Sequence, residues 1–204
     1  MTDRLLPTDK IAAGDLSPDD QAAHDEITVR PIGPADAAAF VDLVAALADY
    51  EHLPPPDDGA RRRLSTDALA NPPRFRVLIA SRAGQAIGYA LYFETYSTFL
   101  ARPTFFLEDL FVLAAERGRG AGRTLLRAVA EEALRLGCGR LEWQVLTWNE
   151  PAIAFYERLG ARRLEDWHGY RLVGQEIARL AERQPSVVSH RFSSPLLGVA
   201  ELRD

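Results

Sequence analysis

The sequence predicts a mixed α+β (α/β) domain in which helices flank one central sheet. Three observations support this prediction: apolar runs with strand-like alternation, amphipathic stretches with helical spacing, and proline- or glycine-rich breaks between them. With 47% apolar and 26% charged residues among 204, the chain can bury a full core without dividing into several domains. We therefore expect one domain with a tail at each end.

Proline and turn residues set the order of elements in the first half of the chain. Pro34 and Asp36 are typical of a helix start, and the prolines at 54–56 end that helix. Residues 82–85 separate two alternating apolar runs, which indicates a β-hairpin. The expected elements are a strand at 26–32, a helix from Pro34 to about Tyr50, a helix at 58–69, and strands at 75–81, 86–95 and 104–113.

The second half continues the alternation of helix and strand. We expect a helix from Arg123 to Leu136, a strand at 140–146, a helix at 150–159 and two strands near 162–167 and 170–174. The central sheet would then have about seven strands. Residues 1–26 are expected to be a disordered tail and 184–204 an extension of unassigned structure, so the domain itself spans 27–183.

Charge and composition argue against several classes of protein. A net charge of −5 disfavours a general nucleic-acid binder or a partner of anionic membranes. The single cysteine, Cys138, excludes an internal disulfide framework. No apolar run is long enough to span a bilayer and no signal segment is recognised, so we expect a cytoplasmic protein. The four histidines lack chelating spacing, which predicts no metal site.

The segment from Arg117 to Gly122 carries the strongest signal for a binding site. Its sequence, Arg-Gly-Arg-Gly-Ala-Gly, lies between an apolar run and a helical pattern. Glycines let successive amide N–H groups converge on an anion at a helix N-terminus, where the helix dipole also favours negative charge. We interpret the segment as a pyrophosphate site with added arginine charge. The alternative is a glycine-rich turn that only reverses the chain.

Two other glycine-rich motifs do not fit these residues. A P-loop requires lysine after its last glycine, but Arg123 and Thr124 follow Gly122. A dinucleotide fingerprint that starts at Gly118 requires glycine or alanine where Arg123 stands. The pattern that remains is Arg-x-x-Gly-x-Gly.

This pattern resembles the cofactor loop of the GNAT superfamily of acetyl-CoA-dependent N-acetyltransferases. Four flanking segments, 47–51, 89–96, 107–112 and 148–161, are similar to the spermidine/spermine (diamine) and thialysine acetyltransferase branch. The likeness spans about residues 27–182. It implies the GNAT acyl-CoA acyltransferase fold, in which a mostly antiparallel, twisted sheet has two strands that splay apart at the CoA site.

Acetyl transfer to an amine requires a base and an acid. A primary amine with a pKa near 10.4 must lose a proton before it attacks, and a thiolate with a reference pKa near 8.5 benefits from receiving one. Tyr156 matches the tyrosine that the family places beside the CoA sulfur, so it is the candidate acid; ordinary helix packing is the alternative. A nucleophilic serine or cysteine is not required, because acetyl-CoA is already activated and positioning can supply much of the rate.

Glu108 is the candidate base. Strand alternation would place it on one face with Phe106, Leu110 and Val112, while Asp109 would point the other way. Apolar surroundings would raise the carboxyl pKa, as a base requires. The alternative is a solvated carboxylate or the partner of an arginine.

The resemblance also implies residues for both substrates. Cofactor contacts are expected from Leu110, Phe111, Val112, Arg117, Gly118, Arg119, Gly120, Ala121, Gly122, Arg123, Asn149 and Tyr156. Acceptor contacts are expected from Tyr50, Glu51, Glu108, Asp109 and His168. His168 stands where the branch usually has a glutamate, which weakens the expectation of a di- or tricationic acceptor.

The sequence therefore predicts an acetyl-CoA-dependent N-acetyltransferase. Its acceptor would be the primary amine of a polyamine, a diamine or a lysine-like amino acid, attacking directly in a ternary complex. The family implies a homodimer, without nucleic-acid or membrane partners. A protein lysine or N-terminal acetyltransferase and a non-catalytic acyl-CoA sensor remain alternatives. Retention of Glu108 and Tyr156 argues against the sensor, because CoA binding requires neither.

Overall fold

The computed structural model describes residues 26–182, which divide into two units with the boundary in the sequence between Gln144 and Val145. Each unit is described by itself. The tails predicted at 1–26 and 184–204 fall outside the described residues, Glu26 excepted.

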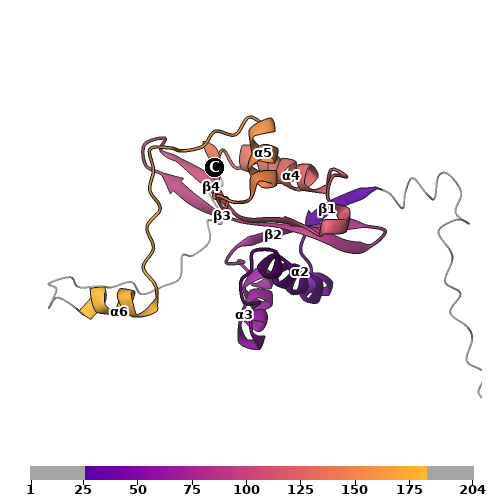
Figure 1. Ribbon diagram of the computed structural model, residues 1–204, viewed down its shortest axis with the longest axis horizontal. Helices are drawn as coiled ribbons and strands as arrows, with labels where there is room; N and C mark the ends of the chain where they lie inside the picture. Colours follow the sequence, from indigo (N-terminus) through magenta and orange to yellow (C-terminus); the bar gives the residue numbers. More distant parts are fainter. Residues whose placement is uncertain (1–25, 183–204) are drawn as a thin grey trace, which may run out of the picture. The chain divides into compact units, whose positions relative to one another are not determined.

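A five-stranded sheet with the order β1-β2-β3-β4-β5 forms the centre of the first unit (Figure 1). Its strands are β1 (Ile27–Pro31), β2 (Arg76–Arg82), β3 (Gln85–Ser97), β4 (Arg102–Val112) and β5 (Arg140–Trp143). The pairs β1–β2, β2–β3 and β3–β4 are antiparallel, and β4–β5 is parallel. The mostly antiparallel central sheet is thus confirmed, but it has five strands where about seven were predicted.

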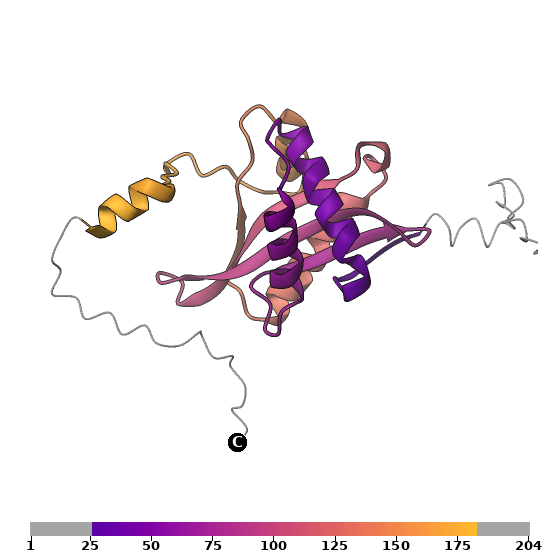
Figure 2. The same ribbon diagram turned by 90° about the horizontal axis from the view of Figure 1, so that it is seen from below.

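Helices cover both faces of this sheet. The helices of the first unit are η1 (Pro34–Asp36), α2 (Ala37–Tyr50), α3 (Asp58–Leu69), η2 (Ala114–Glu116) and α4 (Ala121–Arg135). Helices α2 and α3 lie on one face and α4 lies on the other (Figures 1 and 2). The sequence predicted α2 and α3 closely, because their start and stop signals are local.

The core therefore has two layers, one on each side of the sheet. On the α2 side, the ring of Tyr89 meets the ring of Phe40 edge to face, with centroids 5.3 Å apart. On the α4 side, Tyr92 packs on Phe105 with ring centroids 5.1 Å apart. The buried cluster on the α2 side consists of Phe40, Val41, Leu43, Ala68, Val77, Ile79, Tyr89, Leu91 and Phe111.

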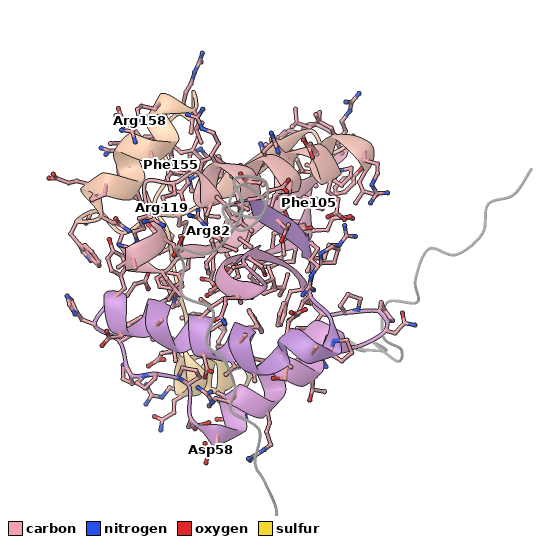
Figure 3. All side chains as sticks on the ribbon, turned by 90° about the vertical axis from the view of Figure 1, so that its right-hand side faces the viewer. Asp58, Arg82, Phe105, Arg119, Phe155 and Arg158 are labelled. Carbon is pink, nitrogen blue, oxygen red and sulfur yellow. The ribbon has the colours of Figure 1, made fainter. Side chains whose placement is uncertain are left out.

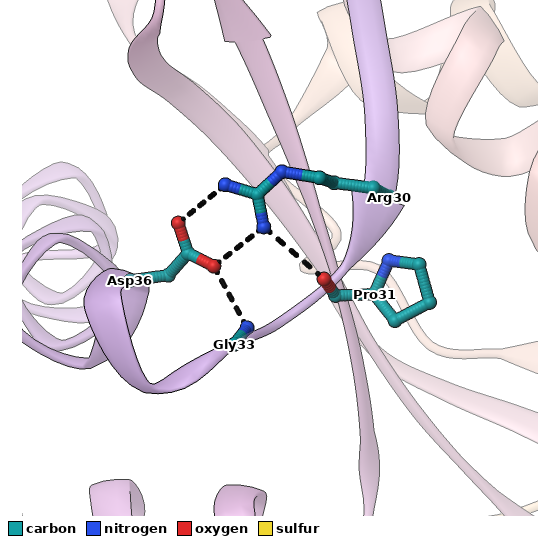
Figure 4. A network of polar contacts seen from close by, with 4 residues as sticks. All are labelled: Arg30, Pro31, Gly33 and Asp36. Carbon is teal, nitrogen blue, oxygen red and sulfur yellow. Dashed lines mark hydrogen bonds and ion pairs between the residues drawn. The ribbon is translucent and has the colours of Figure 1, made fainter.

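An arginine–aspartate pair ties the first strand to the start of the helix that follows it (Figure 4). The two guanidinium nitrogens of Arg30 donate to the two carboxylate oxygens of Asp36 at 2.6 and 2.8 Å. The same carboxylate accepts the backbone N–H of Gly33 at 2.7 Å. Arg30 holds the pKa of Asp36 below its usual range. This bidentate pair fixes the direction in which α2 leaves β1.

The pairing register of β4 changes at Glu108. Successive residues of β3 pair with Leu107 and Asp109, so Glu108 is an extra residue in β4, which makes a β-bulge. A one-residue change of register reverses the face that the following side chains reach. Asp109 and Phe111 consequently lie on the α2 side of the sheet, whereas the buried Leu107 lies on the α4 side.

The second unit contains α5 (Glu150–Arg158) and α6 (Gly174–Glu182) in its described part. The prediction of strands near 162–167 and 170–174 is wrong, because residues 161–173 form no strand and α6 begins at Gly174. Apolar residues at strand-like spacing form a strand only if an adjacent strand pairs with their backbone N–H and C=O groups. Across residues 26–182, no helix combines the length and the apolar character that crossing a bilayer requires.

Candidate functional site

The glycine-rich loop turns the chain from η2 into α4. Gly118 and Gly120 have φ angles of 78° and 95°, a left-handed conformation that glycine adopts at little cost. A Cβ atom at either position would meet no atom within 4 Å, so the space beside the loop is open. Helix α4 begins at Ala121 without a side-chain cap and without an acid in its first turn. Its first N–H groups can therefore bind an anion.

Two arginines near the loop share one carboxylate. An Nη of Arg119 lies 3.8 Å from Oε2 of Glu116, and Nε of Arg82 lies 3.4 Å from the same oxygen (Figure 3 labels both arginines). Nε of Arg82 and Oε2 of Glu116 are buried and form no hydrogen bond. Arg123 adds an exposed charge in the first turn of α4. These three arginines outnumber the one glutamate, so the charged residues named here carry a net positive charge.

The side chain of Arg117 extends toward α2. Its Nε donates to the carbonyl oxygen of Val112 at 2.9 Å. Its guanidinium carbon lies 4.4 Å from the ring centroid of Tyr50 and 5.7 Å from that of Phe111. The backbone of Arg117 is part of the loop, while its side chain contacts Tyr50, which the sequence predicted to contact the acceptor.

Within the first unit, β4 continues beyond its pairing with β5 and has no strand paired to that edge. The parallel pairing ends at Leu107 and Trp143, whereas β4 continues to Val112. The N–H of Leu113 donates to Ile87 at the start of β3, so alternation turns the backbone groups of Val112 and Leu110 away from β3. Acceptance of the Arg117 hydrogen bond by Val112 agrees with this direction.

The backbone of Phe111, which the sequence also predicted to contact the cofactor, points in the opposite direction to that of Leu110 and Val112. Phe111 pairs with Tyr89, and its backbone groups face β3. Leu110 and Val112 therefore offer the backbone groups that an extended ligand can reach along this edge.

A buried tyrosine and a half-buried aspartate form the polar centre of the α2 side. The hydroxyl of Tyr89 donates to Oδ2 of Asp109 at 3.0 Å. Burial raises the pKa of the Asp109 carboxyl to about 6; the nearby Glu108 and Glu51 carboxylates raise it further, and the Tyr89 hydrogen bond opposes them. Burial also raises the pKa of Tyr89 above its usual range. Three acids thus gather where α2 ends beside β4.

The structure corrects the surroundings predicted for Glu108. The prediction placed it on one face with Phe106, Leu110 and Val112, but Glu108 is the bulge residue and its side chain is exposed. Asp109 occupies the half-buried position instead. The alternation rule failed here because it assumes an unbroken register, and the bulge breaks it.

In the second unit, Asn149 caps α5. Its side-chain oxygen accepts the N–H of Ala152 at 3.3 Å, and Pro151 follows in the first turn. Tyr156 lies on the same helix, with its ring 5.3 Å from that of Phe155. His168 is exposed in the segment between α5 and α6.

The first unit brings together most of the residues that the sequence proposed. They are Tyr50, Glu51, Glu108, Asp109, Leu110, Phe111, Val112, Arg117, Gly118, Arg119, Gly120, Ala121, Gly122 and Arg123, whereas Asn149, Tyr156 and His168 belong to the second unit. The sequence analysis did not name Tyr89, Arg82 and Glu116 as site residues. Tyr89 could have been found, because a tyrosine inside an apolar strand is buried and its hydroxyl needs a polar partner. Within the described residues, no cluster of three or more His, Cys, Asp or Glu side chains could hold a metal ion.

Known proteins are similar to this chain in sequence and in fold. The profile of the acetyltransferase (GNAT) family matches residues 41–161. The thialysine N-epsilon-acetyltransferase of Sus scrofa is 32% identical over 166 residues, which cover 76% of this chain and 97% of that protein. The L-ornithine N5-acetyltransferase of Arabidopsis thaliana is 35% identical over 152 residues, which cover 74% of this chain and 61% of that protein.

Among solved structures, an integron cassette protein from the mobile metagenome of V. cholerae has a similar fold. It superposes with a TM-score of 0.65 and 23% identity, over 76% of this chain and 98% of that one. The matched range of the family profile includes the glycine loop, helix α4 and strand β4. The chain belongs to the acetyltransferase (GNAT) family and is an N-acetyltransferase.

Proposed function

We propose that the protein transfers the acetyl group of acetyl-CoA to a primary amine of a small cationic molecule. The class includes polyamines, diamines and lysine-like amino acids. The observation that carries this proposal is the acidic cluster of Glu51, Glu108 and Asp109 beside Tyr89. The charges that act on Asp109 are those of two other carboxylates, and a bound ammonium group would offset their repulsion. Two relatives are named for thialysine and L-ornithine, which both carry a side-chain amine.

The residues around the loop fit acetyl-CoA, which would supply an activated acetyl group. The first N–H groups of α4 and the amides beside Gly118 and Gly120 can bind pyrophosphate, with charge added by Arg119 and Arg123. The backbone groups of Leu110 and the N–H of Val112, which face away from β3, suit the amide-containing pantetheine arm. The side chain of Asn149 and the backbone of Phe111 are further contacts by resemblance alone.

Asp109 is the group best suited to take the proton of the amine. A carboxyl pKa of about 6 makes it a stronger proton acceptor than an ordinary aspartate and leaves it ionised at neutral pH. The hydroxyl of Tyr89 orients this carboxylate from inside the core. The role of base, first assigned to Glu108, thus passes to Asp109 in this proposal.

The exposed Glu108 and the half-buried Glu51 are suited to hold the ammonium group of the acceptor. Tyr50, which precedes Glu51 at the end of α2, would form one wall of the same site. His168 is the further acceptor contact that the family resemblance suggests. With a histidine there, we expect acceptors with one distal cation to be preferred over longer polyamines.

Tyr156 is the proposed acid for the departing thiolate. Support comes from its place on α5 after the Asn149 cap, which matches the family pattern. A phenol with an ordinary pKa near 10 can protonate a thiolate whose reference pKa is near 8.5. A Tyr156→Phe variant would keep the ring and remove this proton.

We also propose a homodimer, on the family resemblance, and the cytoplasmic location that the sequence pattern predicts. An exposed apolar tip between β3 and β4 adds support, because Phe99 is 98% exposed and Tyr96 is 63% exposed. Analytical ultracentrifugation of the full chain tests the homodimer, and a monomer at micromolar concentration would contradict it.

The test of function is the release of CoA thiol from acetyl-CoA with spermidine, putrescine, thialysine, ornithine, lysine and a lysine peptide. Turnover with a small amine that is lost in Asp109→Asn and Tyr156→Phe would support the proposal. The matched control is Glu131→Gln, which removes an exposed carboxylate of α4 and should leave turnover unchanged. Turnover with the peptide alone would favour a protein acetyltransferase, and CoA binding without turnover would favour a sensor.

A further inference from the structure

The side chain of Arg117 links the start of the glycine loop to the end of α2. Its Nε–H binds the carbonyl of Val112 at 2.9 Å, and its guanidinium carbon lies 4.4 Å from the ring centroid of Tyr50. Tyr50 is the last residue of α2, and Val112 is the last residue of β4. Arg117 therefore contacts the ends of both elements at once.

The end of α2 also carries an acceptor-site carboxylate. Glu51 directly follows Tyr50, and its charge acts on both Asp109 and Tyr89. The position of Glu51 relative to Asp109 depends on how the end of α2 is held. The stacking of Arg117 on Tyr50 is one of the contacts that hold it.

We propose that Arg117 is a positioning residue that couples the two substrate sites. Acetyl-CoA binding fixes the glycine loop, Arg117 then holds Tyr50, and Glu51 is kept in place for the amine. This inference rests on the proposed function. By thermodynamic reciprocity, the amine increases the affinity for the cofactor by the same factor by which the cofactor increases the affinity for the amine.

Arginine is suited to this role in a way that lysine is not. A planar guanidinium can lie over an aromatic ring while its Nε–H donates in the plane of the guanidinium, whereas an ammonium group is a compact, strongly hydrated charge with no plane to lay on the ring. The next residue, Gly118, has a φ of 78°, so the chain has a conformationally permissive position directly after Arg117. An anchor at Arg117 restricts the freedom that this glycine gives to the loop.

The experiment compares the wild type with Arg117→Lys, Arg117→Gln, Tyr50→Phe and Tyr50→Leu. Amine affinity is measured by calorimetry with and without CoA, and KM is measured for each substrate. We expect both Arg117 variants to raise the amine KM about fivefold and to reduce the coupling factor, with the acetyl-CoA KM changed less than about twofold. Tyr50→Phe keeps the ring and should keep the coupling. The control, Arg74→Gln, removes an exposed arginine paired with Asp67 and should change neither constant.

A double variant separates coupling from two independent contacts. If Arg117 acts through Tyr50, Arg117→Gln with Tyr50→Leu raises the amine KM no more than the worse single variant. Additive effects would overturn the proposal. The proposal would also be overturned if Arg117 behaved as a direct ligand of the pyrophosphate. In that case Arg117→Gln raises the acetyl-CoA KM, Arg117→Lys resembles the wild type and the amine KM is unchanged.

One arm does not depend on amine turnover. If no amine is acetylated, the proposed function fails, but a double-mutant cycle on the free energy of unfolding still tests the contact between Arg117 and Tyr50. Non-additivity in that cycle supports the contact, and additivity overturns the inference whatever the acceptor is.

Discussion

Two tyrosine–carboxylate pairs lie on opposite faces of the sheet. On the α2 face, Tyr89 donates to Asp109, and on the α4 face, Tyr92 donates to Glu132. Both tyrosines are buried side chains of β3. The two pairs differ in the charges beside the carboxylate. Nη1 of Arg76 lies 2.5 Å from Oε1 of Glu132, whereas the negative charges of Glu108 and Glu51 raise the pKa of Asp109.

This difference supports the proposal that the Tyr92–Glu132 pair is structural and that Asp109 takes part in the reaction. A guanidinium balances Glu132 within a hydrogen-bonded network, and that network ties α4 to the sheet. Burial raises the pKa of Tyr92, and Arg76 opposes that shift. Asp109 is destabilised as an anion, which gives it a higher proton affinity and makes its surroundings attractive to an ammonium group. The same kind of hydrogen bond thus lies in two different charge environments.

The largest expected effect is on turnover. Asp109→Asn should lower kcat/KM for the amine by roughly a hundredfold or more, since it removes the proposed proton acceptor. Its counterpart Glu132→Gln should keep kcat/KM within about threefold in the folded protein, because that carboxylate lies on the other face. Initial rates of CoA release give both values. Equal losses in the two variants would remove the distinction between the pairs.

Stability should show the reverse order. Glu132→Gln should lower the free energy of unfolding by about 1–3 kcal/mol, because it leaves Arg76 without its charged partner. Asp109→Asn should be neutral or stabilising at pH 7, since it removes a carboxylate that is costly to ionise. Urea unfolding followed by circular dichroism measures both. A destabilised Asp109→Asn protein would mean that this pair is structural as well.

The pH dependence of stability sharpens the comparison. The pKa of Asp109 is about 6 in the folded protein, above the value near 3.9 of an unfolded chain, so the folded state holds more protons between these limits. The free energy of unfolding should fall by about 2 kcal/mol as pH rises from 4 to 6.5. The difference curve between the wild type and Asp109→Asn isolates this contribution. A flat difference curve would argue against the raised pKa.

The smallest effect concerns the tyrosine hydroxyls. The Tyr89 hydrogen bond lowers the pKa of Asp109, so Tyr89→Phe should move the acid limb of the pH–kcat/KM profile to higher pH by up to about one unit. Tyr92→Phe should leave this limb in place and lower the free energy of unfolding by about 1 kcal/mol. A shift of the limb in Tyr92→Phe would show that the two faces are not independent.

The sequence by itself determined those features that depend on neighbouring residues. Helix α3 spans the predicted residues 58–69, because its signals are local: an aspartate caps its start and prolines follow its end. The loop glycines at 118 and 120 take left-handed conformations, which glycine adopts at little cost. The cap formed by Asn149 belongs to the same class. Motif spacing was also sufficient to indicate the family, because the cofactor loop is a contiguous segment.

Tertiary structure alone decided which carboxylate is half-buried, where Arg117 reaches and how many strands form. The bulge at Glu108 arises from pairing between β3 and β4, so alternation within β4 could not predict that Asp109 turns toward Tyr89. Arg117 stacks on a residue of α2 that lies far from it in the sequence. Residues 161–173 have apolar spacing, but a strand also requires a partner. In each case the deciding interaction joins distant segments, and its register and charge environment are properties of the folded chain.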